Sequence, residues 1–202
     1  MPRPIRKPAG PSAPLNGKHV ILGVGGGIAA YKVCDLASQL VKQGALVTAV
    51  MTRGAQKLVT PYTFEALTGQ PCLTRMFHRI GPRVSPYPHL EPAQDAALAI
   101  IAPATANLMA RLAHGLASDL LSTLMLSVRC PVLICPAMNT RMWEHPATQA
   151  NARLLQSYGY KLLGPASGRL ACGTEGEGRM VEVAEIVAAA QAALGQRMKD
   201  EG

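Results

Sequence analysis

A glycine-rich segment near the end of the chain surrounds a single thiol. Residues 168–180 read GRLACGTEGEGRM, so glycines flank Cys172 on both sides. This composition predicts a loop that folds over a ligand and presents the sulfur, because such loops become ordered when substrate binds. Arg179 in the same segment would favour an anion or a thiolate. The remaining cysteines are interpreted as small buried apolar residues: Cys34, Cys72, Cys130 and Cys135.

A second glycine cluster, residues 25–30, fits the pattern G-x-G-x-x-A of phosphate-binding turns. It is either a phosphate site at the start of a helix or a tight turn that needs positive φ angles. A nicotinamide dinucleotide would require an acid about 20 residues later, and none lies between Asp35 and Glu65. Arg53 leaves NADP as an option, whereas FMN needs no such acid. The single phosphate of FMN could be held by backbone amides and three side chains: Thr52, Arg53 and Thr105.

Two further loops carry polar side chains directly after apolar runs. PATAN (103–107) places Thr105 and Asn107 where a helix must begin, so these residues cap the helix or contact a ligand. PAMN (136–139) ends in Asn139, whose carboxamide suits a carboxylate or an amide. The alternative for this asparagine is a left-handed turn position.

Three more side chains have both a structural and a functional interpretation. His89 follows a proline-rich stretch and is either a structural histidine or a base, since its pKa lies close to neutral. Met142 and Trp143 are either ordinary packing residues or an apolar wall for a flat cofactor. No set of His, Cys, Asp and Glu has the spacing of metal ligands, so no metal site is predicted.

A parallel α/β sheet would position these residues. Apolar runs at 19–24, 45–51, 96–104 and 130–139 predict strands buried on both faces, and helical spacing separates them. The alternation predicts one doubly wound α/β domain of the Rossmann or flavodoxin-like type with a mostly parallel sheet. The loops described above each follow a strand, so they should meet at the carboxyl edge of the sheet, where ligands bind.

The folded domain is predicted to cover residues 18–195. Residues 1–17 contain five prolines and predict a basic, disordered tail, and residues 196–202 form a C-terminal tail. Residues 71–89 are rich in proline and glycine and predict a long irregular segment that is functional or mobile.

Composition restricts the partners. The net charge is +8, but four uncompensated cations lie in the first 18 residues and only 4% of residues are aromatic, which argues against nucleic acid. Mild positive charge fits small anionic ligands. With no apolar run of 18 residues and no apolar leader, we expect no membrane span, no secretion and a cytoplasmic location. Only 16% of residues are charged, which indicates surface covered by a ligand or by other subunits.

Taken together, the motifs resemble the homo-oligomeric flavin-containing cysteine decarboxylases. The segments that carry the resemblance are, in order, GVGGGIAAYK, HLE, APATANLMARLAHGLASDLLST, CPAMNTRMWEHPATQ and ACGTEGEGRM, and it covers about residues 18–195. The combination of the motifs ACG and GRM is more similar to that of the branch that acts on phosphopantothenoylcysteine than to the motifs of the peptidyl-cysteine decarboxylases. Flavin prenyltransferases share the fold but not this combination of motifs.

The resemblance implies a mechanism. FMN would oxidise the cysteine thiol of (R)-4'-phosphopantothenoyl-L-cysteine to a thioaldehyde, CO2 would leave, and reduced flavin would return a hydride to give 4'-phosphopantetheine. By residue matching, His89 would be the base, Cys172 the proton donor and Asn139 the group that holds the substrate carboxylate or amide. Met142 and Arg179 would contact substrate. The positions matched to FMN contacts are Gly26, Gly27, Thr52, Arg53, Gly54, Thr105, Ala106, Asn107 and Ala137.

The resemblance also implies an assembly and leaves alternatives. Family members form trimers with flavin between subunits, or dodecamers of four trimers, and many bacterial members are fused to the phosphopantothenate–cysteine ligase, which is therefore an expected partner. The alternatives are a peptidyl-cysteine decarboxylase, a flavin prenyltransferase and a non-catalytic FMN-binding regulatory subunit. The presence of both His89 and Cys172, together with the lack of long acidic tails, favours an enzyme.

Overall fold

The computed structural model describes residues 14–76, 87–171 and 173–200, with side-chain surroundings up to residue 195. Its centre is a five-stranded sheet in the order β2-β1-β3-β4-β5, and every pairing is parallel. The strands are β1 (His19–Val24), β2 (Leu46–Met51), β3 (Ala96–Ala104), β4 (Val132–Pro136) and β5 (Lys161–Leu162). This order is that of flavodoxin-like folds, so the predicted fold class is confirmed.

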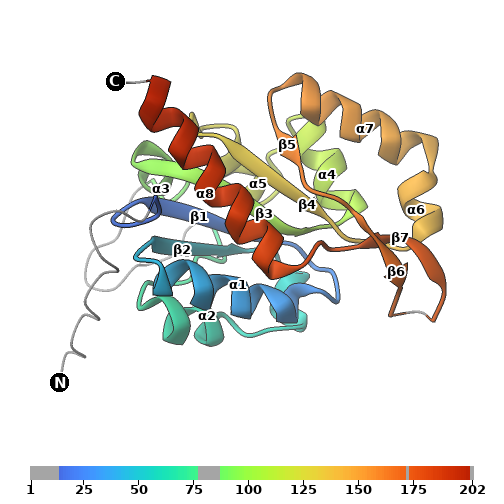
Figure 1. The fold of residues 1–202 in the computed structure, drawn as a ribbon, viewed down its shortest axis with the longest axis horizontal. Coiled ribbons are helices and arrows are strands. Elements are labelled where there is room, and N and C mark those ends of the chain that lie inside the picture. Colours follow the sequence, from blue (N-terminus) through green and yellow to red (C-terminus); the bar gives the residue numbers. More distant parts are fainter. Residues whose placement is uncertain (1–13, 77–86, 172, 201–202) are drawn as a thin grey trace.

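Helices cover both faces of the sheet (Figure 1). One buried cluster joins the sheet to α1 (Ala30–Lys42), α2 (Pro61–Thr68) and α8 (Val183–Asp200). A second cluster joins the opposite face to α4 (Ala106–Ala113), α5 (Leu120–Met125) and α7 (Pro146–Ser157). Burial on both faces explains why the central strands are almost wholly apolar.

The helix boundaries follow local signals in the sequence. Helix α1 ends before Gly44, whose φ of +88° suits glycine, and α2 begins with Pro61 in its first turn and ends at Gly69, with φ of +69°. Asp119 caps α5 and accepts hydrogen bonds from the backbone and hydroxyl of Ser122. Burial raises the pKa of Asp119, but these bonds and the Arg111 guanidinium outweigh that effect and hold it below its ordinary value.

The glycine-rich segment is not the loop that the sequence predicts. β6 (Ala166–Arg169) and β7 (Glu175–Arg179) pair antiparallel as a separate two-stranded sheet, here called the hairpin. The prediction fails because alternating Gly and Glu give little local strand signal. Two short helices were also not predicted, α3 (Glu91–Gln94) and α6 (Thr140–Glu144). The helical piece that the sequence predicts over residues 52–59 is present only as a 3-10 turn, η1 (Ala55–Lys57).

The ends of the domain extend slightly beyond the predicted boundaries. Leu15, within the expected tail, is fully buried in the core, and α8 continues to Asp200. Residues 1–13 of the N-terminal tail, residues 77–86 of the irregular segment and Cys172 lie outside the described residues. Burial raises the pKa of the Cys72 and Cys135 thiols to about 12, in agreement with their interpretation as buried apolar residues.

Candidate functional site

A cavity of about 650 Å³ lies at the carboxyl edge of the sheet. The loops that follow β1, β3 and β4 contribute to it, together with the hairpin and α6, and the hairpin lies beside α6 at one end of the molecule (Figure 1). Its lining residues are Gly27, Ile28, Ala29, Tyr31, Lys32, Thr105, Ala137, Met138, Asn139, Met142, Arg169, Leu170, Ala171, Gly178, Arg179 and Met180.

The glycines after β1 are needed because loops pass close to one another. A Cβ at Gly25 would overlap the carbonyl oxygen of Pro103, and a Cβ at Gly26 would lie 2.9 Å from the Gly54 backbone. None of Gly25, Gly26 and Gly27 has a positive φ, so the tight-turn interpretation of this cluster is wrong. Gly27 has room for ordinary contacts and lines the cavity.

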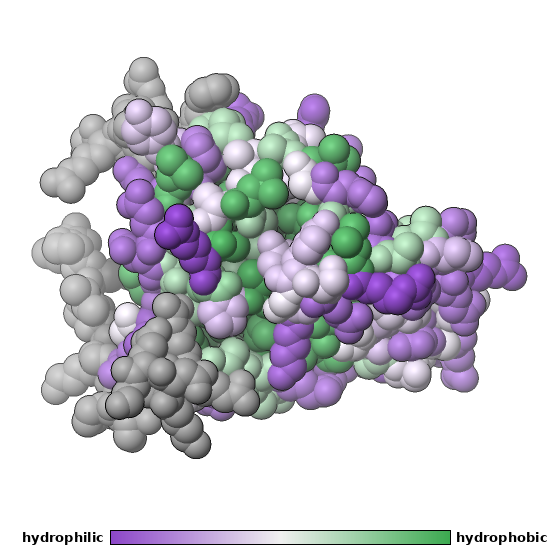
Figure 2. All heavy atoms as spheres, turned by 90° about the horizontal axis from the view of Figure 1, so that it is seen from above, coloured by the Kyte–Doolittle hydropathy of each residue, from purple (hydrophilic) through white to green (hydrophobic). Residues whose placement is uncertain are grey.

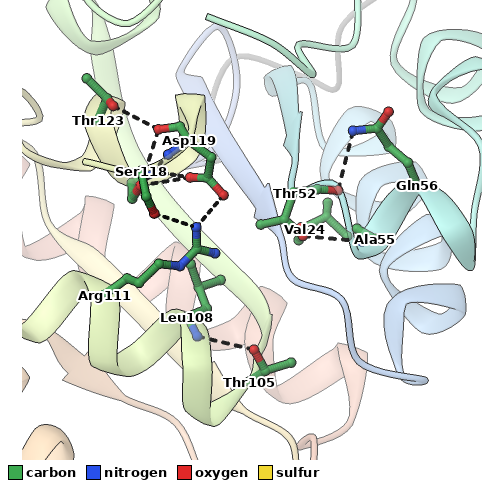
Figure 3. A network of polar contacts seen from close by, with 11 residues as sticks. Val24, Thr52, Ala55, Gln56, Thr105, Leu108, Arg111, Ser118, Asp119 and Thr123 are labelled. Atoms are coloured by element: carbon green, nitrogen blue, oxygen red, sulfur yellow. Dashed lines mark hydrogen bonds and ion pairs between the residues drawn. The ribbon is translucent and has the colours of Figure 1, made fainter. Parts of the chain in front are cut away.

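The first turn of α1 can receive an anion. Its N-cap residue, Ala29, makes no side-chain capping bond, and Gly27 and Ala29 line the cavity. Helix N-termini carry partial positive charge and exposed N–H groups, so an uncapped one attracts phosphate. By contrast, Thr105 caps α4 by accepting a hydrogen bond from the Leu108 backbone at 3.3 Å (Figure 3).

The loop after β2 lies beside the cavity and is absent from its described lining. Thr52 is buried, and its hydroxyl donates to the Val24 carbonyl and accepts from the Ala55 N–H (Figure 3). Arg53 and Gly54 are exposed. The Thr52 hydroxyl therefore fixes the loop, and Arg53 provides its exposed cation.

Asn139 lies on the cavity wall and begins α6. Its side-chain oxygen accepts a hydrogen bond from the Arg141 N–H at 2.9 Å, and its φ of −63° excludes the left-handed turn. Because the oxygen is used as the cap, the carboxamide nitrogen is the group directed to other partners. Met142, half exposed, lines the same cavity, whereas Trp143 packs against the second core cluster.

The hairpin is fixed against the PAMN loop. The Met138 N–H donates to the Gly178 carbonyl at 2.9 Å, and a Cβ at Gly178 would overlap the Met138 carbonyl oxygen. Arg169, Ala171 and Arg179 of this region line the cavity. Cys172 is outside the described residues, and its chain neighbour Ala171 is part of the lining.

Charge in the cavity is one-sided. Among its described lining residues are three cations, Lys32, Arg169 and Arg179, and no acid. Glu182, just before α8, contacts two of them, at 3.3 Å from Lys32 Nζ and 2.5 Å from an Arg179 nitrogen. Sequence reasoning missed Lys32, although its place in the first turn after the glycine loop was a usable signal.

His89 is not brought to this cavity within the chain. It precedes α3, which leads into the amino end of β3, whereas the cavity is at the carboxyl end, and Figure 1 shows α3 and the hairpin at opposite ends of the molecule. The His89 carbonyl accepts from the Ser127 hydroxyl at 2.9 Å. Its ring atom Nδ1 is buried without a hydrogen-bond partner among the described residues.

The opposite edge of the sheet holds a second cavity of about 740 Å³. His19, Thr48, Asp95 and Glu91 of the HLE segment are among its lining residues, and its described lining contains none of the predicted catalytic or binding residues. Burial lowers the pKa of His19, and the carboxylate of Asp95 opposes this effect. Within the described ranges, no helix has the length and apolar character of a bilayer-spanning segment, and no cluster of three or more His, Cys, Asp or Glu could hold a metal.

Comparisons with known proteins identify the family of this chain. The model of the family described as Flavoprotein matches residues 9–195. Over 174 residues the chain is 45% identical to the coenzyme A biosynthesis bifunctional protein CoaBC of Vibrio cholerae. The matched region covers 86% of this chain and 43% of that protein. The chain therefore spans less than half the length of that relative.

Solved structures show the same similarity. The chain is 30% identical to the FMN-dependent cysteine decarboxylase SpaF, with a TM-score of 0.75 over 91% of this chain and 98% of that one. It is 27% identical to a PPC decarboxylase variant in complex with pantothenoylaminoethenethiol, with a TM-score of 0.77 over 88% and 98% of the two chains.

Proposed function

The chain belongs to the Flavoprotein family, and on this basis we propose that it is an FMN-dependent decarboxylase that converts (R)-4'-phosphopantothenoyl-L-cysteine to 4'-phosphopantetheine in coenzyme A biosynthesis. The observation that carries the proposal is the cavity, whose described lining has three cations and no acid. The substrate has a phosphate and a carboxylate, so its charge complements the cavity. The 45% identity to a coenzyme A biosynthesis protein supports the same assignment.

The residues at the sheet edge fit a flavin mononucleotide. When bound, FMN supplies the reversible two-electron oxidation of the substrate thiol. The uncapped start of α1, which follows Gly26 and Gly27, suits its phosphate. Gly26 lies close to Gly54, the neighbour of Arg53, and Thr52 holds that loop in place. The remaining proposed contacts lie in the loops after β2, β3 and β4: Gly54, Thr105, Ala106, Asn107 and Ala137.

The cavity wall orients the substrate. Asn139 has its oxygen committed to the α6 cap, so its amide N–H groups are the donors for the substrate carboxylate or amide. Met142 gives an apolar wall, and Arg179 attracts an anionic group of the substrate.

Two residues are proposed to move protons. Cys172, next to the lining residue Ala171, would donate the proton that the decarboxylated substrate needs as it is reduced to product, and His89 would remove the proton from the substrate thiol. Since His89 lies at the other edge of its own chain, we propose that a neighbouring copy in a trimer or dodecamer supplies it. The ligase that makes the substrate is the expected functional partner.

The purified protein tests this function directly. We expect a yellow protein that releases FMN on denaturation and liberates CO2 from phosphopantothenoylcysteine. Cys172→Ser should still release CO2 but stall with reduced flavin, because the last proton is missing. A colourless protein that FMN cannot reconstitute would contradict the proposal.

A peptidyl-cysteine decarboxylase is the second candidate, because the chain is 30% identical to SpaF. Incubation with a peptide that ends in cysteine separates the two. We expect little turnover of an unphosphorylated peptide, since the cationic lining would be left without its anion.

A further inference from the structure

Lys32 and Arg179 lie on the cavity wall and both contact Glu182, and the proposed function gives no role to Lys32 or Glu182. We propose that Lys32, together with Arg179, binds the phosphate of the substrate and makes the enzyme selective for phosphorylated pantothenoylcysteine. This inference rests on the proposed function and names two residues that set its specificity.

The geometry of the cluster is that of an anion site with an internal counter-ion. Lys32 comes from the first turn of α1 and Arg179 from the end of β7, yet both contact the carboxylate of Glu182. The Glu182 side chain is 55% exposed and that of Lys32 only 25%. An exposed carboxylate is displaced at little cost, because ion pairs in contact with water contribute little to stability. Glu182 thus holds the two cations in place until a phosphate replaces it.

The position of Lys32 separates it from the proposed flavin phosphate. The loop with Thr52 and Arg53 lies on the β2 side of α1 and does not line the cavity, whereas Lys32 points to Glu182, at the start of α8. The flavin phosphate is proposed at the Gly26–Gly27 turn, which contacts Gly54, and the substrate phosphate at Lys32 and Arg179, so the two anions have different partners.

The phosphate is also the suitable group for a permanent anchor. The substrate carboxylate leaves as CO2, but the phosphate keeps its charge through the whole reaction. Contacts that are equal in the ground state and the transition state lower KM and leave kcat unchanged. Loss of Lys32 should therefore change KM and spare kcat.

Steady-state kinetics of the FMN-loaded protein test the proposal, with phosphopantothenoylcysteine and its dephosphorylated form as the two substrates. For Lys32→Ala we expect KM for the phosphorylated substrate to rise about tenfold or more, with kcat within about twofold, since bonds between charged groups contribute on this scale. The dephosphorylated substrate should show no change. Lys42→Ala removes an exposed lysine at the other end of the same helix and should match the wild type.

Glu182→Gln provides the opposite change. Without the internal carboxylate, the phosphorylated substrate should bind several-fold more tightly and the dephosphorylated one equally well. Equal effects of Lys32→Ala on both substrates, or loss of FMN from this variant, would overturn the proposal. Failure of the proposed function itself is distinct, because then the FMN-loaded wild type would release CO2 from neither substrate.

Discussion

Asn139 serves both the fold and the proposed chemistry, and two substitutions separate these roles. Asp at this position keeps an oxygen that can accept from the Arg141 N–H, but it replaces the amide donor with a negative charge. We predict that Asn139→Asp keeps FMN and thermal stability but loses decarboxylation by about 100-fold or more, since like charges would face each other. Flavin absorbance, Tm and CO2 release measure the three properties.

Asn139→Ala is the matched comparison. It removes the cap as well and should also lower stability by about 1 kcal/mol. Normal turnover by Asn139→Asp would show that the Asn139 amide does not hold the substrate.

At the residue scale, the sequence predicted which residues lie at the cavity better than it predicted which residues they contact. Gly27, Thr105 and Asn139 line the cavity, as expected for residues that follow parallel strands. Met142 and Arg179 line it from α6 and the hairpin. The reason for the glycines could not be predicted, because the close approach of Gly26 to Gly54 joins two loops far apart in the chain. The pairing of Lys32 with Glu182, 150 residues away, is hidden for the same reason.

At the scale of elements, the hairpin is held over the cavity by a contact that only glycine allows. In Gly178→Ala the new methyl group would overlap the Met138 carbonyl, so the hairpin must shift. We predict a loss of roughly 1–3 kcal/mol in stability and a several-fold rise in KM, because Arg179 moves with β7. Thermal unfolding and steady-state kinetics measure both effects.

Gly195→Ala is the control for this substitution, since no atom of the described residues lies within 4 Å of a Cβ at this position in α8. It should leave KM unchanged and stabilise the helix slightly. An unchanged KM and Tm in Gly178→Ala would show that the hairpin is not fixed in this way.

The parallel pair of β1 and β2 contains a pH-sensitive contact. His19 Nε2 lies 2.8 Å from the Thr48 hydroxyl, and burial lowers the pKa of His19 despite the opposing charge of Asp95. Below the ordinary histidine pKa of about 6.5, the unfolded chain therefore binds more protons than the folded chain. The contribution of neutral His19 to the free energy of unfolding is complete above that pH and is lost as the pH falls.

We predict that the free energy of unfolding decreases from pH 7.5 to pH 5.5 and that His19→Gln reduces this dependence. Urea denaturation at several pH values measures it. An unchanged slope in His19→Gln would assign the effect to other groups.

The sequence predicted elements where local signals are strong. Apolar runs marked the four long strands, and Gly44 and Gly69 marked helix ends. The hairpin was missed because its stability comes from cross-strand pairing and from contact with the Met138 loop, neither of which is local. Short helices such as α6 have too few residues for a periodic signal.

At the scale of the whole molecule, the surface around the cavity suggests a contact with another copy. Ile28, Tyr31 and Met142 line the cavity and are about half exposed or more. Figure 2 shows hydrophobic residues exposed over the middle of one face and many hydrophilic residues toward the end that holds the hairpin in Figure 1. Exposed apolar side chains at a site rim are typical of interfaces, and this is consistent with a neighbouring copy that supplies His89.

Complementation between two inactive variants tests whether His89 acts across an interface. His89→Asn leaves the cavity intact, and Asn139→Asp leaves the imidazole intact, so each variant alone should be inactive. In a mixed oligomer, a site that takes its cavity from one chain and its histidine from the other is complete. In a cyclic trimer that contains both variants, one of the three such sites is complete, so the purified mixed trimers should have about one third of wild-type activity.

Co-expression with two different tags and sequential purification isolates the mixed oligomers, and CO2 release measures their activity. Each variant paired with itself under two tags is the control and should remain inactive. If tagged mixed oligomers bind FMN and stay inactive, the histidine acts within its own chain or not at all. The distance along β3 between α3 and the cavity makes the first of these improbable for a rigid sheet, so such a result would remove His89 from the mechanism.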